Sequence, residues 1–330
     1  MKKKNKHRLS ISLIVLLVVA FSGCVIVQQA KQMKKTARNA ENTTETPQIT
    51  VANNMEKDSS SEQTEIAEKA TTEAEVTEST TEEIASEESL DDLKQKLLDD
   101  ISGSGFDLAT VSVFVKDLQE QDYMNLDAGA GRAASLIKLF VAGTVYEEMK
   151  NGTLSSSYEG ELPSLVSNMI TVSDNTACNT LIKKLGDGSA AKGMDKVNAY
   201  CAEHGFTATS MGRLMLDFSS SKDNVTSVTD CTRFLRLVYE NKITGAKEIL
   251  NYLKQQTRTG KIPAGVPSFV TTANKTGELD DTENDAAIIY LEGKPYILCV
   301  MVTKTTNVAA ARKLITTISK HTYEYFSEES

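Results

Sequence analysis

Histidine and paired cysteines are scarce in this 330-residue chain, which has three histidines and five cysteines but no Cys-x-x-Cys motif. Because metal centres gather His, Cys, Asp or Glu ligands at short spacings, this scarcity gives no reason to expect a metal. A glycine-rich phosphate-binding loop is also missing, so we expect no nucleotide cofactor. Basic residues are not in excess either: the net charge is −9, whereas a nucleic-acid-binding surface needs positive charge. We therefore expect no cofactor, no metal and no nucleic-acid partner.

Large apolar side chains are almost missing from residues 35–87, which are rich in Glu, Ser, Thr and Ala. Such a segment cannot bury enough surface to offset chain entropy, so we predict a disordered acidic linker. Before it, residues 1–34 contain a basic stretch and an apolar run over 11–27, as in a secretory signal or a membrane anchor. Apolar patterning that can build a core begins near Leu90, which predicts one domain over 88–330.

Two processing outcomes fit the N-terminal segment. Phe21-Ser22-Gly23-Cys24 resembles a bacterial lipobox, in which Cys24 is lipidated and becomes the mature N-terminus. The apolar run continues beyond Cys24 and reaches the short end of a membrane span, so an uncleaved anchor fits equally well. Either outcome tethers the domain to the outer face of the bacterial cell membrane. For the other four cysteines we expect buried free thiols, although export would permit a disulfide.

The patterning of residues 88–330 places strands at both ends of the domain and helices between them. It predicts helices over 88–100 and 308–325, a mainly helical stretch over 135–253, and strands over 109–115, 121–127, 268–273, 286–291 and 296–303. Short turns such as Glu292-Gly293-Lys294 imply an antiparallel sheet. We therefore predict an α/β fold of the α+β type. In it, an antiparallel sheet is covered by helices beside an all-helical lobe, and the site lies between lobe and sheet.

Ser135-Leu136-Ile137-Lys138 places a serine and a lysine three residues apart, so that on a helix their side chains share a face. A serine hydroxyl needs a neighbouring base to become a nucleophile, and Lys138 can be that base if burial lowers its pKa. If Ser135 begins the helix, its backbone N–H also faces the cleft as an oxyanion donor. The alternative is a helix-capping serine with a solvated lysine, but the apolar neighbours of Lys138 favour a role.

A second motif, Ser173-Asp174-Asn175, follows a mostly apolar stretch. Ser173 can relay a proton to a leaving nitrogen, Asn175 can hydrogen-bond a substrate amide, and Asp174 can hold the turn. As a bare tripeptide this motif is also a common start of a helix. It is a candidate for function only in combination with the other motifs.

A third motif, Lys275-Thr276-Gly277, ends a predicted strand, and an edge strand can dock a peptide-like substrate by backbone hydrogen bonds. Lys275 supplies positive charge, Thr276 can bind a substrate carboxylate, and Gly277 lets the substrate approach closely. The N–H of Glu278 is a second candidate oxyanion donor. Alone, the tripeptide fits a strand-end turn equally well.

The three motifs occur in the order typical of penicillin-recognising serine enzymes. Over about residues 90–328 the chain resembles the class A β-lactamase family and its penicillin-binding relatives, and the segments 169–179, 262–267 and 282–285 add to the resemblance. It implies a serine hydrolase that forms an acyl-enzyme at Ser135. The site residues it implies, catalytic and then substrate-binding, are Ser135, Lys138, Ser173 and Lys275, followed by Asn175, Thr276, Gly277, Glu278 and Lys261.

The stretch that matches the family's deacylating loop departs from the family pattern. β-Lactamases of this family carry a glutamate two residues after an arginine, and that glutamate activates the hydrolytic water. Arg213 matches the arginine, which puts Met215 at the glutamate position, and a thioether cannot accept a proton. We therefore expect acylation with slow deacylation, and Asp217 is the nearby carboxylate that would have to substitute. Lys261 matches a carboxylate-binding position of some members, although it and nearby Arg258 also fit a solvated surface.

The leading hypothesis is a monomeric penicillin-binding enzyme with DD-peptidase-like action on the D-Ala-D-Ala ends of peptidoglycan stem peptides. The alternative is a functional β-lactamase, which rapid hydrolysis of penicillins or cephalosporins would reveal. Two weaker alternatives are a sensor domain that acylates once and an esterase that uses the same serine.

Overall fold

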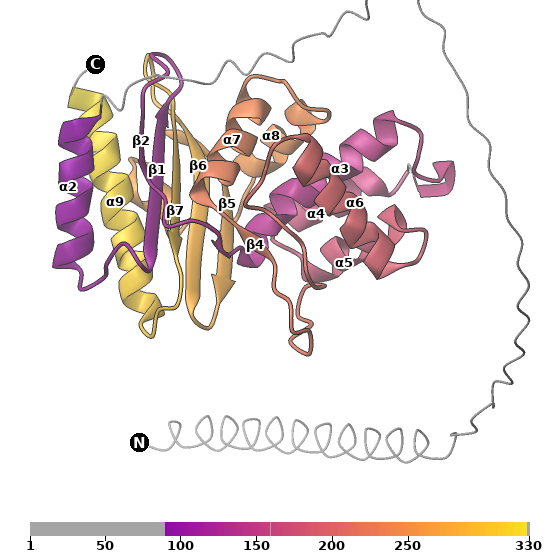
Figure 1. The fold of residues 1–330 in the computed structure, drawn as a ribbon. Coiled ribbons are helices and arrows are strands. Elements are labelled where there is room, and N and C mark those ends of the chain that lie inside the picture. Colours follow the sequence, from indigo (N-terminus) through magenta and orange to yellow (C-terminus); the bar gives the residue numbers. More distant parts are fainter. Residues whose placement is uncertain (1–89, 159, 329–330) are drawn as a thin grey trace, which may run out of the picture. The chain divides into compact units, whose positions relative to one another are not determined.

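The computed structural model describes residues 90–158 and 160–328, so the predicted leader, anchor and linker lie outside the described residues. A five-stranded antiparallel sheet runs through this part of the chain in the order β2-β1-β7-β6-β5 (Figure 1). Its strands are β1 (Val111–Asp117), β2 (Tyr123–Leu126), β5 (Thr271–Leu279), β6 (Thr282–Tyr290) and β7 (Tyr296–Val302). The predicted fold class, an antiparallel sheet with helical layers and a helical lobe, is confirmed.

The two terminal helices of the domain cover one face of the sheet (Figure 1). They are α2 (Asp91–Gly103) and α9 (Val308–Glu328). Leu93, Leu97 and Ile101 recur at helical spacing on α2 and are all buried against this face. On the outer side, Asp100 of α2 lies 2.6 Å from His321 of α9. The first and last helices thus close one core together.

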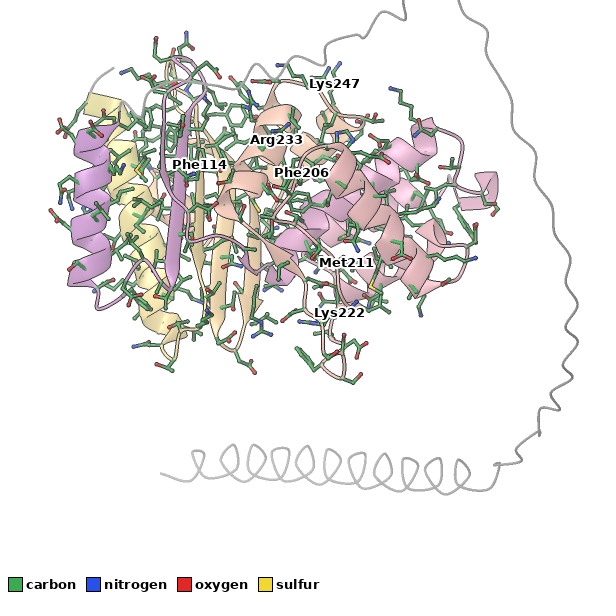
Figure 2. All side chains as sticks on the ribbon, viewed as in Figure 1. Phe114, Phe206, Met211, Lys222, Arg233 and Lys247 are labelled. Carbon is green, nitrogen blue, oxygen red and sulfur yellow. The ribbon has the colours of Figure 1, made fainter. Side chains whose placement is uncertain are left out.

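The other face of the sheet meets the helical lobe. Its helices are α3 (Ile137–Lys150), α4 (Leu162–Thr171), α5 (Asn175–Leu185), α6 (Ala190–Glu203), α7 (Val228–Tyr239) and α8 (Ala246–Lys254), with 3-10 turns at Ala134–Leu136, Ser156–Tyr158 and Ile262–Gly265. Figure 2 shows Phe206 inside this layer, where its ring lies 5.1 Å from that of Phe140 and 6.0 Å from that of Phe234. These aromatic rings fill the centre of the lobe.

Strand β7 is buried along its whole length because it separates the two cores. Ile297 and Cys299 point toward the helical lobe, while Leu298 and Val300 point toward α2 and α9. This alternation follows from the two-residue period of a strand, and it explains why the strand reads as a continuous apolar run. The sheet is therefore held from both faces.

Strand β5 is longer than the sequence predicts and differs in position. Its expected span was 268–273, but it runs from Thr271 to Leu279, so the Lys275-Thr276-Gly277 motif lies within the strand and not at its end. Pairing with β6 continues to the tight turn at residues 280–281, with Gly277 opposite Asn284. The sequence interpretation ended the strand too early because apolar alternation stops at the polar motif, whereas hydrogen-bonded pairing with β6 continues beyond it. The short strands β3 (Gly131–Arg132) and β4 (Val225–Thr226) were also not predicted.

The described cysteines, Cys178, Cys201, Cys231 and Cys299, are buried free thiols. Among residues 90–158 and 160–328, no helix combines the length and apolar character needed to cross a bilayer.

Candidate active site

Ser135 lies at the point where the chain enters the first helix of the lobe. It belongs to the 3-10 turn Ala134–Leu136, which leads directly into α3, and its side chain is partly exposed. Ala134, just before it, has a φ of 48°, in the left-handed region that residues other than glycine rarely adopt. Such a conformation costs on the order of 1–3 kcal/mol and is typical of functional sites. The strained residue thus directly precedes Ser135, the predicted nucleophile.

Lys138 lies one helical turn after Ser135 and is completely buried. Its Nζ lies 3.1 Å from Ser135 Oγ and donates to Asn175 Oδ1 and to the Ser173 carbonyl oxygen, each at 2.7 Å. Burial lowers the pKa of Lys138 to about 8, and the charge of Arg258 acts in the same direction. A fraction of the amine is therefore neutral near pH 7 and can accept a proton.

Ser173 lies in the turn between α4 and α5, with a φ of 60°. Asp174 caps α5 by accepting the Ala177 N–H at 2.7 Å, so it holds the turn as expected. This geometry directs Ser173 Oγ to a point 3.2 Å from Lys138 Nζ and 2.9 Å from Lys275 Nζ. The Ser173 hydroxyl thus connects the two lysines.

Lys275 reaches the same hydroxyl from the sheet. It is completely buried in β5, and its Nζ also donates to the Thr276 carbonyl oxygen at 2.8 Å. Burial lowers the pKa of Lys275 well below its usual value, and the positive charge of Lys138 lowers it further. Two amines that share one serine hydroxyl cannot both stay charged at low cost.

Gly277 allows β5 to lie against the backbone of the turn that carries Ser135. A Cβ at this position would lie 2.8 Å from the Ala133 carbonyl oxygen and 3.2 Å from Ser135 N. Any side chain would therefore push the strand away from Ser135. The close approach brings together the two backbone segments that carry the predicted oxyanion donors, the N–H groups of Ser135 and Glu278.

These residues surround one open pocket. Its lining consists of Ser135, Ser173, Asn175, Arg258, Thr276 and Glu278. Lys138 and Lys275 lie buried beneath Ser135 and Ser173. The structure thus brings together the predicted nucleophile, the predicted bases and most of the predicted substrate-binding residues.

Lys261 is not part of this lining, contrary to the expectation that it contacts substrate. Its side chain is only 3% exposed, and its Nζ lies 2.7 Å from Glu283 and donates to the Asn284 carbonyl oxygen at 2.9 Å. Arg258, which the sequence offered only as a nearby charge, is the arginine that lines the pocket. Lys261 does not reach the pocket because its ammonium pairs with the buried Glu283 carboxylate, and Arg258 lines the pocket in its place.

The loop over 211–224 places Met215 beside the helix that carries Asn175. One turn along α5, the side chain of Asn179 accepts from Met215 N at 2.8 Å and donates to Met215 O at 3.0 Å. The loop is closed by an ion pair between Arg213 and Asp223 at 2.8 Å. Met215 is buried and contacts Asn224, with 3.9 Å between Sδ and Nδ2.

Asp217 does not reach the pocket from this loop. Its side chain is exposed and accepts hydrogen bonds from Ser219, which lower the pKa of Asp217 and weaken it as a base. In the part of the chain that the structure describes, the carboxylate that lines the pocket is Glu278, whose side chain the sequence interpretation did not consider. Its two-residue spacing from Thr276 in a strand would have predicted this placement.

A model of the beta-lactamase enzyme family matches residues 159–326, slightly more than half of the chain. Among solved structures, a mutant of PBP-A in an acyl-enzyme complex with penicillin G is 22% identical, with a TM-score of 0.63 over 72% of this chain and 97% of that one. A β-lactamase from Sphaerobacter thermophilus is 19% identical, with a TM-score of 0.61 over 72% and 98%. No curated protein matches the sequence.

A third similar structure is a variant of the class A β-lactamase of the last common ancestor of Gram-negative bacteria. It is 20% identical, with a TM-score of 0.62 over 72% of this chain and 100% of that one. At such low identities the solved structures establish the shared fold alone. The family model covers the part of the chain that carries the Ser173 and Lys275 motifs. The chain therefore belongs to the beta-lactamase enzyme family, and it is a serine hydrolase of that family.

Proposed function

We propose that the chain is a penicillin-binding enzyme with DD-peptidase-like action on D-Ala-D-Ala peptides, in which the acyl group on Ser135 is released slowly. The observation that carries this proposal is the fixed position of Met215. Its backbone is held by both hydrogen bonds of Asn179, in the loop where the family pattern has a carboxylate. The acylating groups are complete, whereas the group that activates water is replaced by a thioether.

Acylation follows from the hydrogen bonds around Ser135. Neutral Lys138 accepts the Ser135 hydroxyl proton over 3.1 Å as Oγ attacks the carbonyl carbon of the scissile amide. The N–H groups of Ser135 and Glu278 stabilise the oxyanion, and two such donors are worth several kcal/mol at the transition state. Ser173 then gives its proton to the leaving nitrogen and takes one from Lys138 over 3.2 Å. The carbon–nitrogen bond breaks, and the acyl group stays on Ser135 Oγ.

Deacylation needs a base that removes a proton from water. General-base assistance typically contributes about 10²–10⁴-fold, so its loss leaves a long-lived adduct. A β-lactamase that uses Asp217 has less support, because that carboxylate is exposed and engaged with Ser219. Penicillin G is a suitable probe because it acylates the structurally similar PBP-A mutant.

We also propose that the N-terminal segment tethers the enzyme to the outer face of the cell membrane, where peptidoglycan is accessible. The support is the basic stretch, the apolar run over 11–27 and the Ser-, Thr- and Glu-rich segment over 35–87. Release of the chain from a membrane fraction by carbonate wash would contradict this proposal.

Intact-protein mass spectrometry over time after addition of benzylpenicillin tests the acyl-enzyme directly. The full-length chain should gain the mass of one benzylpenicillin molecule and keep it long after free drug is removed. Ser135→Ala should gain nothing. Rapid return to the free mass with hydrolysed drug would instead identify a β-lactamase. Absence of any adduct, together with turnover of small chromogenic esters, would indicate an esterase.

A further inference from the structure

Lys261 is a buried cation that lies close to the site without lining its pocket. Its side chain is only 3% exposed, and its Nζ lies 2.7 Å from Glu283 and 3.3 Å from Glu278. Removal of an ammonium group from water is costly unless protein groups replace the lost water. The two carboxylates account for part of this replacement, and backbone carbonyl groups add to it.

The Lys261 amine also contacts both strands through their backbones. Its Nζ donates to the Asn284 carbonyl oxygen at 2.9 Å and to the Gly277 carbonyl oxygen at 3.4 Å. Gly277 and Asn284 lie opposite each other in β5 and β6. One ammonium group thus holds the paired residues at the point where β5 lies against the turn that carries Ser135.

The Gly277 carbonyl belongs to the same peptide group as the N–H of Glu278, the second predicted oxyanion donor. In a planar trans peptide the carbonyl oxygen and the amide hydrogen point in opposite directions. Because the oxygen faces the buried Lys261, the N–H points away from that lysine, as a donor aimed at the pocket requires. A positive charge at the oxygen end also polarises the peptide group, which strengthens its N–H as a donor.

Asn284 connects the same lysine to the first predicted donor, the N–H of Ser135. While its carbonyl oxygen accepts from Lys261, its side-chain Nδ2 donates to the Arg132 carbonyl oxygen at 2.9 Å and to that of Ala133 at 3.3 Å. These two carbonyl groups belong to the segment that leads into the turn with Ser135. Both predicted donors therefore depend on the residue pair that Lys261 holds.

We propose that Lys261 is a positioning residue for acylation: its ammonium group orients and polarises the peptide between Gly277 and Glu278, so that the N–H of this peptide stabilises the oxyanion. The inference rests on the proposed acylation of Ser135, and it assigns a function to a lysine that does not touch substrate. A fixed charge behind the donor requires no rearrangement during the reaction, which is how preorganised dipoles stabilise a transition state. Lys261 therefore acts on the rate of bond formation and not on how tightly the substrate first binds.

The test separates first binding from bond formation on the full-length chain. The rate of Ser135 acylation is followed by mass spectrometry as the benzylpenicillin concentration is raised, which yields the dissociation constant of the first complex and the maximal acylation rate. Lys261→Met removes the charge at similar side-chain length. Lys261→Met combined with Glu283→Gln removes both charges of the buried pair and serves if the single variant folds poorly. A thermal unfolding midpoint for each variant monitors the fold.

The matched control is Arg312→Gln. It removes a cation that pairs with the same two carboxylates, Glu278 and Glu283, while Lys261 stays on the carbonyl groups. A general effect of lost positive charge would therefore appear in this control as well.

Lys261→Met should lower the maximal acylation rate about tenfold and leave the dissociation constant nearly unchanged. This loss is smaller than the roughly 10²–10³-fold loss typical when an oxyanion donor is deleted, because the N–H itself remains in place. Isotope-edited infrared spectra of the acyl-enzyme should show the ester carbonyl band at a higher frequency, since weaker hydrogen bonds to the carbonyl oxygen leave it more double-bond character. Arg312→Gln should leave the rate and the band nearly unchanged.

A loss confined to the dissociation constant would mean that Lys261 only attracts the carboxylate of benzylpenicillin, and the inference would be wrong. An equal effect of Arg312→Gln, or an unshifted carbonyl band in both Lys261 variants, would also overturn it, while the acyl-enzyme and the proposed function stand. No Ser135 adduct in the wild type would contradict the proposed function and the inference with it.

Discussion

Two buried lysines share one serine hydroxyl at the centre of this site. Ser173 Oγ lies 3.2 Å from Lys138 Nζ and 2.9 Å from Lys275 Nζ. The motifs in the sequence identified all three residues, because their types and order are specific. Their protonation was not readable from the motifs, since the pKa of an amine depends on how completely it is buried and on which charges surround it. The structure supplies both quantities.

The lowered pKa of Lys138 predicts how acylation depends on pH. Lys138 acts as a base only when neutral, and its pKa is about 8, so the rate should rise with pH up to about 8 and level off above it. Below that pH each unit should change the rate about tenfold, because the neutral fraction changes by that factor. The measurement is the second-order rate of Ser135 acylation by benzylpenicillin from pH 6 to 9, corrected with Ser135→Ala. A flat profile would show that Lys138 is not the base.

Lys261 and Arg258 show the limit of residue-level interpretation. They lie three positions apart in the chain, and the sequence made Lys261 a candidate for carboxylate binding with Arg258 as a nearby charge. Whether such a side chain faces the pocket or a buried partner depends on Glu283, which is only 1% exposed and comes from the adjacent strand. No residue near Lys261 in the sequence indicates that Glu283 is its partner.

At the scale of elements, the proposed slow deacylation depends on the loop over 211–224. Its ends are joined by the ion pair between Arg213 and Asp223, and its middle is bound to α5 through Asn179. The sequence places Met215 at the glutamate position because Arg213 matches the arginine of the family pattern, and this assignment stays a prediction. The extent of β5 was predicted wrongly, because pairing with β6 and not apolar alternation keeps that strand going through its polar motif.

Met215→Glu should accelerate release of the acyl group. The new carboxylate would lie in a buried position beside Asn224, where it can accept a proton from water. Deacylation should become about 10²–10⁴-fold faster, the range typical of general-base catalysis. The decay of the benzylpenicillin adduct measures this rate.

Met215→Gln is the control, since it has the same shape without a basic group. Equal decay rates for Met215→Glu, Met215→Gln and the wild type would mean that the loop does not limit deacylation.

At the scale of the whole domain, the sheet separates two cores with different tasks. The core between the sheet and helices α2 and α9 contains Leu97 and Val300, whereas the other core belongs to the helical lobe that carries Ser135 and Ser173. The two terminal helices stabilise the sheet from the face away from the lobe (Figure 1). We therefore expect a substitution in the core next to α2 and α9 to change stability without changing acylation.

Leu97→Ala should lower the free energy of unfolding without changing the site. Leu97 is completely buried, and such truncations typically cost about 2–5 kcal/mol. Acylation of Ser135 in the folded protein should stay nearly unchanged. Urea denaturation of the full-length chain provides the energy.

Leu108→Ala is the matched control, because that leucine is 42% exposed and its loss should change stability by only about 0.5 kcal/mol. Loss of acylation in folded Leu97→Ala would show that the two cores are coupled.

The sequence by itself determined the candidate site: the predicted nucleophile, its predicted base, the connecting serine and the methionine at the position where the family pattern has a glutamate. These follow from residue types at fixed spacings, which survive in a one-dimensional pattern. Only the tertiary structure decided that Lys261 lies beneath the sheet, that Arg258 faces the pocket and that Glu278 occupies it. The reason is that charge pairing across strands and between distant segments joins residues that no local pattern connects.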